Sequence, residues 1–96
     1  MVEQIQKIAS EHFGIPDDML RAKTRKKEIV YARQVTMYLS KEMTNSSLKT
    51  IGLHFGGRDH STVIHAIQCV QKMIEIDVRT RETIQDLRKI IEMASM

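Results

Sequence analysis

The chain has 96 residues, of which 42% are hydrophobic and only 4% aromatic, and its formal net charge is +3. This length supports one domain with a modest aliphatic core and excludes two. The sequence contains no apolar run of about 18 residues for a membrane span, no secretory signal pattern, and a single cysteine, Cys69, which excludes an internal disulfide. We therefore expect one cytoplasmic, all-α domain covering residues 1–96.

The positive charge is confined to the middle of the chain. Residues 21–66 carry nine basic and three acidic residues, whereas residues 1–20 are net acidic and residues 67–96 are neutral. Because each phosphate contact is made at short range, the local density of Lys and Arg matters more for binding a polyanion than the total charge. This distribution favours a negatively charged partner for the middle of the chain.

The first third of the sequence predicts two helical segments and a loop. Residues 2–13 have the apolar spacing of an amphipathic helix, which we expect Gly14 to end. Pro16 followed by two acids is typical of a first helical turn, so residues 16–20 predict one or two turns. Residues 21–27 contain five cations and no acid, and we interpret them as a basic loop. Taken alone, such a run is usually a solvated surface.

Two further helices follow from the periodicity. Residues 28–43 predict a long core helix with an opposite face formed by Arg33, Gln34, Met37 and Lys41. The turn cluster at residues 44–47 is able to cap the next helix, which runs through Phe55. Beyond Asp77 we expect a last helix that packs back on the others, which gives about six helices in all.

The stretch at residues 51–66 combines a turn with a polar helix start. Gly56 and Gly57 offer positive φ between two helical patterns, which predicts a tight corner. Polar residues 58–62 follow, with Asp59 or Ser61 as the expected helix cap, and apolar helical spacing then resumes. A helix-turn-helix presents the start of its second helix to the DNA major groove in this way, so we predict such a motif at about residues 47–75.

The run from Phe55 to Val63, Phe-Gly-Gly-Arg-Asp-His-Ser-Thr-Val, resembles the C-terminal DNA-binding domain of the bacterial replication initiator DnaA, and the resemblance extends from Ile5 to about Ile76. It implies a Trp-repressor-like domain that binds double-stranded DNA at origin boxes of the form TTATNCACA. The resemblance implies major-groove contacts by Asp59, His60 and Ser61, and a minor-groove contact by Arg25. The other expected DNA-binding residues are Lys26, Lys27, Arg33, Gln34, Lys41, Thr44, Arg58, Thr62 and His65.

The same resemblance implies partners outside this sequence. No Walker-type Gly-rich loop is present, so the ATPase domain of an initiator would lie upstream. We expect the isolated domain to be a monomer without a cofactor. The alternative function is a helical interaction module whose basic loop docks an acidic protein or acidic phospholipids.

Catalysis and metal binding are not expected. Asp59, His60 and Ser61 are consecutive, and consecutive residues of one helix point in different directions, so they cannot form a hydrolytic triad. The spacing of His54, His60 and His65 does not place them on one helical face as metal ligands. We therefore expect a binding domain and not an enzyme.

Overall fold

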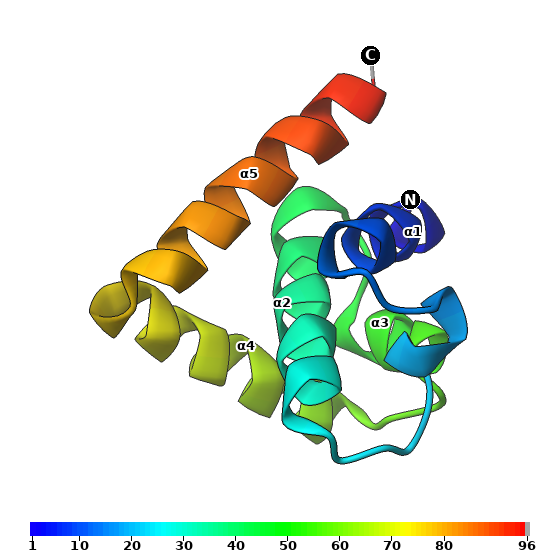
Figure 1. Ribbon diagram of the computed structural model, residues 1–96. Coiled ribbons are helices and arrows are strands. Elements are labelled where there is room, and N and C mark those ends of the chain that lie inside the picture. Colours follow the sequence, from blue (N-terminus) through cyan, green and yellow to red (C-terminus); the bar gives the residue numbers. More distant parts are fainter. Residues whose placement is uncertain (96) are drawn as a thin grey trace.

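The structure is a computed structural model that describes residues 1–95, so only residue 96 of the predicted 1–96 domain lies outside it. The described residues form five α-helices and one 3-10 helix, without strands (Figure 1). This confirms the expected all-α class, although one of the about six predicted helices is a single 3-10 turn. The elements are α1 Val2–Phe13, η1 Asp17–Leu20, α2 Lys27–Met43, α3 Leu48–His54, α4 His60–Ile76 and α5 Val78–Ala94.

Several helix ends lie where local sequence predicted them. Gly14 ends α1 with φ 67°, and η1 begins directly after Pro16. The Ser47 side chain accepts a hydrogen bond from the Thr50 N–H at 3.1 Å, which caps α3. Each of these ends depends on residues close together in the chain, so the signal is contained in short stretches of sequence.

Helix α2 is the centre of the fold and packs against every other described element (Figure 1). The sequence predicted an outer face for this helix, and that prediction was wrong for Met37 and Arg33, which are 1% and 8% exposed. Of the four predicted outer residues, only Lys41 is exposed, and Gln34 is half-buried. A helix covered on most sides has no wide polar face, and periodicity alone does not reveal this.

Two hydrophobic clusters hold the helices together. The first joins α1, η1 and α2 to the α3–α4 unit, and the second joins α1, α2 and α4 to α5. The first cluster contains Val2, Leu20, Ala32, Met37, Ile51, Phe55, Val63 and Ala66. The second contains Ile5, Val35, Tyr38, Leu39, Val70, Ile84, Leu87 and Ile91. The first half of α4 is therefore fixed by one cluster and the second half by the other.

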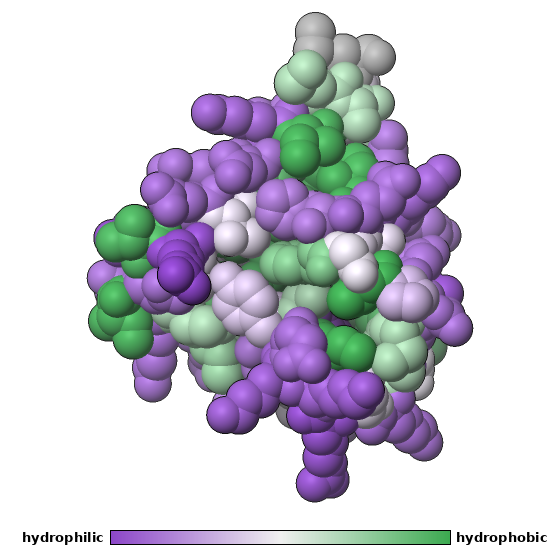
Figure 2. Space-filling view, viewed as in Figure 1, coloured by the Kyte–Doolittle hydropathy of each residue, from purple (hydrophilic) through white to green (hydrophobic). Residues whose placement is uncertain are grey.

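The surface differs between the two ends of α4. Hydrophilic side chains gather along the lower edge of the molecule in Figure 2, below the start of α2. A hydrophobic patch lies at the left edge, at the α4–α5 junction, where Ile76 and Val78 are exposed (Figure 2). No helix within residues 1–95 is long and apolar enough to cross a membrane.

Candidate nucleic-acid interface

The corner between α3 and α4, residues 55–58, is built on glycine. Gly56 and Gly57 have φ values of 78° and 76°, which confirms the predicted Gly-Gly turn. The Arg58 N–H donates to the Gly52 carbonyl at 3.0 Å, and a Cβ on Gly52 would collide with the Arg58 carbonyl oxygen. The two helices of the helix-turn-helix therefore approach through backbone contact, which fixes the direction in which α4 leaves the corner.

Asp59 begins α4 as its N-cap. Its Oδ1 atom accepts hydrogen bonds from the Thr62 N–H at 3.0 Å and from the Thr62 hydroxyl at 3.1 Å. These two bonds, the backbone bond first, lower the pKa of the Asp59 carboxyl. The sequence allowed either Asp59 or Ser61 as the N-cap of α4, and the structure shows that it is Asp59. Asp59, His60, Ser61 and Thr62 are all exposed, and we call residues 59–62 the α4 tip.

Arg58 does not share the exposed surface of the tip, contrary to the sequence prediction. It precedes α4, is half-buried, and donates from Nη1 to the Phe55 carbonyl and from Nη2 to the Ala22 carbonyl at 2.9 Å. Burial lowers the pKa of its guanidinium, which stays protonated at neutral pH. The physical reason for the correction is that two backbone carbonyls, one of them 36 residues away in the sequence, hold the guanidinium against the corner and the loop.

The basic loop is shorter than predicted. Arg21 ends η1, Lys26 precedes α2, and Lys27 is the first residue of α2, so the loop proper covers residues 22–26 and not 21–27. Arg25, Lys26 and Lys27 are all exposed. They therefore present three adjacent cations to solvent, as the DNA-binding prediction requires.

Arg33 also corrects a prediction, because it lies beneath the loop and not on the surface. Its Nε donates to the Leu20 carbonyl at 3.2 Å, and its Nη2 donates to the carbonyls of Ala22 and Thr24 at 2.8 and 3.3 Å. Burial, followed by the neighbouring charge of Arg58, lowers its pKa. With 8% of its surface exposed, Arg33 supports the loop from beneath.

The basic loop and the corner are in direct contact, although more than 30 residues separate them in the sequence. Besides the Arg58 bond to Ala22, the Gly56 backbone packs so closely on Arg21 that an added Cβ would lie 2.5 Å from its carbonyl oxygen. Loop and corner both lie towards the lower edge of Figure 1. The tertiary structure thus brings the backbone at the start of the loop against the corner from which α4 begins.

The remaining predicted contacts have separate surroundings. Gln34 is half-buried on α2, and Lys41 is exposed near the end of the same helix. The Thr44 hydroxyl donates to the Ser40 carbonyl at 2.6 Å and accepts from the Ser46 N–H at 3.1 Å, so it organises the turn before α3. His65 is exposed on α4, one turn beyond the tip.

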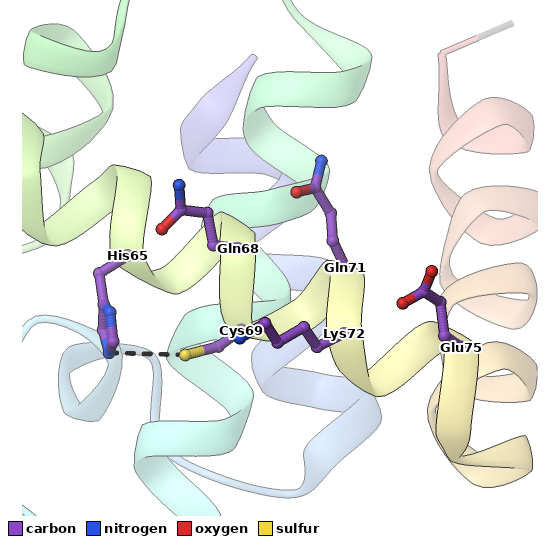
Figure 3. Close-up of a pocket in the computed structure, with 6 residues that line it drawn as sticks. All are labelled: His65, Gln68, Cys69, Gln71, Lys72 and Glu75. Carbon is purple, nitrogen blue, oxygen red and sulfur yellow. Dashed lines mark hydrogen bonds between the residues drawn. The ribbon is translucent and has the colours of Figure 1, made fainter.

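The outer flank of α4 carries a shallow depression (Figure 3). His65 Nε2 lies 3.5 Å from Cys69 Sγ in it, and the other side chains come from the same helix. The lining residues are His65, Gln68, Cys69, Gln71, Lys72 and Glu75. No group of three or more His, Cys, Asp or Glu side chains suited to a metal ion occurs within residues 1–95.

Sequence reasoning missed the backbone groups that join the loop to the corner. The carbonyl oxygens of Arg21 and Ala22 are the contact points, and a carbonyl has no side-chain identity that a motif search detects. The difference between Gly56 and Gly57 was missed for a related reason. Both have positive φ, but only a Cβ on Gly56 would meet other atoms within 4 Å, the nearest being the carbonyl oxygen of Arg21, just before the loop.

Comparison with known proteins agrees with this geometry. The bacterial DnaA protein helix-turn-helix family matches residues 2–70. The chromosomal replication initiator protein DnaA of Chlorobaculum tepidum is 55% identical over 95 residues, which cover 99% of this chain. They cover 19% of that relative, so this chain spans about a fifth of the relative's length. The chain belongs to the bacterial DnaA helix-turn-helix family.

Proposed function

We propose that this chain binds double-stranded DNA sequence-specifically at replication-origin boxes of the TTATNCACA type, as the DNA-binding domain of a replication initiator. The observation that carries this proposal is the joining of two unlike exposed elements, the polar α4 tip and the cationic basic loop, through the Arg58 bond to Ala22. A helix start suits the wide major groove, and an arginine on a loop suits the narrow minor groove.

The α4 tip supplies the groups for direct readout. The cap bonds of Asp59 to Thr62 end on Oδ1, which leaves Oδ2 as the oxygen to accept a hydrogen bond from a cytosine amino group. His60, Ser61 and Thr62 add ring and hydroxyl donors on the same tip. Ser61 lacks the methyl group of the threonine often found at this position in the family, so its contact with a thymine methyl is weaker.

The basic loop supplies the second contact. Arg25 is the residue we assign to the minor groove at the T-rich end of the box, because A·T-rich minor grooves are narrow and attract arginine. Lys26 and Lys27 bind phosphates on either side. We also assign contacts with the DNA backbone to Gln34, Lys41, Thr44 and His65, of which Lys41 and His65 are the most exposed.

The wider context is part of the same proposal. The resemblance to the initiator family also implies an ATPase domain in the full-length protein, which would supply its nucleotide-dependent activity. The domain binds one box as a monomer and needs no cofactor for that contact. A chromosomal target places it in the cytoplasm.

A mobility-shift titration tests the proposal. A TTATNCACA duplex and a scrambled duplex of the same composition are compared at one salt concentration, because affinity for DNA depends steeply on salt. We expect the cognate duplex to bind at least 10³-fold more tightly, at the lower end of the range for specific DNA-binding domains. Equal affinity for both would reject sequence-specific binding.

A competition experiment with phospholipid vesicles distinguishes DNA binding from the alternative function. Anionic phospholipid vesicles compete with the cognate duplex for the chain, and neutral vesicles serve as the control. If the anionic vesicles displace the duplex at physiological salt, the basic loop serves a lipid or acidic partner. We expect no displacement, because the exposed α4 tip has no function in such a module.

A further inference from the structure

We propose that Arg33 and Arg58 are positioning residues that set the separation between the basic loop and the α4 tip by donating to one shared carbonyl, and so determine DNA specificity without contacting DNA. This inference rests on the proposed function and deepens it. Its physical basis is a clamp that joins three segments of the chain at the Ala22 oxygen.

The clamp is defined by two hydrogen bonds. The Arg33 Nη2 atom, from α2, lies 2.8 Å from the Ala22 oxygen, and the Arg58 Nη2 atom, from the corner, lies 2.9 Å from the same oxygen. Within residues 1–95, the hydrogen bonds that tie the backbone of residues 22–25 to the body of α2 and to the corner all come from these two arginines. Without them, the loop is held only at its ends.

Two guanidinium groups at one carbonyl repel each other, so this arrangement needs compensation. The additional carbonyls of Leu20, Thr24 and Phe55 supply it, and charged hydrogen bonds of this kind are stronger than neutral ones. Arg33 is 8% exposed and Arg58 is half-buried, so a DNA phosphate has less access to them than to the exposed loop cations. Both side chains are therefore better suited to hold the loop than to bind DNA.

A second contact, at the backbone of Gly56, fixes the same separation. A Cβ on Gly56 would lie 2.5 Å from the Arg21 carbonyl oxygen, whereas a Cβ on Gly57 would meet nothing within 4 Å. The two glycines have nearly equal φ values of 78° and 76°. The corner therefore packs on Arg21, which leads into the loop, through residue 56 and not through residue 57.

A fixed separation matters because the two DNA contacts are made by one rigid body. Once the α4 tip is in the major groove, the minor-groove contact is intramolecular, and its strength depends on how well the loop is held in place. Nonspecific binding to phosphates has no such geometric requirement. Loss of the clamp should therefore reduce cognate binding much more than scrambled binding.

The two glycines give a matched pair of variants. Gly56→Ala and Gly57→Ala introduce the same left-handed strain, and only in Gly56→Ala would the added Cβ also press on the Arg21 carbonyl oxygen, at 2.5 Å, and on Arg58 Nη1, at 3.1 Å. We expect the ratio of cognate to scrambled affinity to fall about tenfold further in Gly56→Ala than in Gly57→Ala. Equal ratios in the two variants would overturn the proposal.

A double-mutant cycle tests the arginine itself. Arg25→Ala is measured in the wild type, in Arg58→Met, in Arg58→Lys, which keeps the charge, and in Arg79→Met, an exposed control on α5. If Arg58 positions the loop, Arg25→Ala should lose most of its effect in both Arg58 backgrounds, with a coupling of about tenfold, and keep it in the control. Two outcomes would show that Arg58 acts on DNA directly. The first is that the losses of affinity from Arg25→Ala and from the Arg58 variants add. The second is that Arg58→Met weakens binding to the cognate box whereas Arg58→Lys binds it as tightly as the wild type.

A measurement without DNA separates this inference from the proposed function. Spin labels are placed at the exposed positions of Lys23→Cys and Gln68→Cys, in a Cys69→Ala background, and their distance distribution is recorded in the free protein. We expect a broader distribution in Arg58→Met, Arg58→Lys and Gly56→Ala, and no change in Arg79→Met and Gly57→Ala. An unchanged distribution in all variants would overturn the clamp, whatever the DNA result.

Discussion

Within the basic segment of residues 21–66, two groups of cations have opposite surroundings. Arg25, Lys26 and Lys27 are exposed on or next to the loop, whereas Arg33 and Arg58 lie beneath it with their donors on backbone carbonyls. All five have the same sign of charge and belong to the same charge-rich segment. The comparison shows that a high density of positive charge identifies a region of the surface, but not which of its residues are free to bind DNA.

The largest expected effect concerns the buried group. Arg33→Met removes the donors to the carbonyls of Leu20, Ala22 and Thr24, and of these three acceptors only Ala22 keeps another arginine donor, Arg58. We expect the free energy of unfolding to fall by about 3 kcal/mol, measured by urea denaturation. The exposed control Arg79→Met should change it by less than about 0.5 kcal/mol. A comparably small loss in Arg33→Met would mean that the buried group is not structural.

The exposed group should show the reverse pattern. Arg25→Ala should leave the free energy of unfolding within about 0.5 kcal/mol of the wild type, because its side chain is exposed. It should weaken binding to the cognate box by about 1 to 3 kcal/mol, and binding to scrambled DNA by less. Titrations of both duplexes measure the difference. Equal losses would make Arg25 a phosphate ligand.

The α4 tip carries a side chain of the opposite charge, Asp59. In Asp59→Asn the amide oxygen keeps the Thr62 cap, and the amino group then faces the base, where a cytosine offers another donor. We expect a cognate loss of about 1 to 2 kcal/mol, with equal or tighter binding to scrambled DNA because a negative charge is removed.

A duplex with that cytosine replaced is the control for Asp59. The loss from the base change and the loss from Asp59→Asn should not add, because both remove one shared contact. Strict additivity, with the fold intact by circular dichroism, would place Asp59 away from the base and confine it to capping.

A smaller effect is expected for Lys26. Lys26→Ala should weaken all duplexes about equally and reduce the slope of log affinity against log salt by about 0.9, the contribution of one phosphate. Binding at four salt concentrations gives the slope. If the loss were confined to the cognate box, Lys26 would belong with Arg25 as a residue that distinguishes sequences.

The smallest effect concerns the acid stability of the free domain. Because the folded state lowers the pKa of Asp59, its contribution is complete above the unfolded value of about 3.9 and is lost as pH falls through the lower folded value. Urea midpoints at pH 6 and pH 3 should therefore fall slightly more in the wild type than in Asp59→Asn. Equal decreases would show that the cap bonds do not depend on the charge.

The sequence by itself determined the features that depend on neighbouring residues. The left-handed glycines at positions 14, 56 and 57, the helical turn after Pro16 and a polar cap at the start of α4 all follow from conformational preferences within a few residues. The resemblance to a known family placed the exposed tip and the loop cations in one candidate site. These features are local in the chain, so a linear sequence contains them.

Only the tertiary structure decided which cations are exposed. Arg33 and Arg58 bond a carbonyl that lies 11 and 36 residues away along the chain, and Met37 is buried because other helices surround α2. A backbone carbonyl is present at every position, so no residue type marks the one that will accept these bonds. The packing of the helices brings donor and acceptor together. This packing therefore decides that Arg33 and Arg58 bond to the loop backbone, whereas Arg25, Lys26 and Lys27 are exposed to solvent.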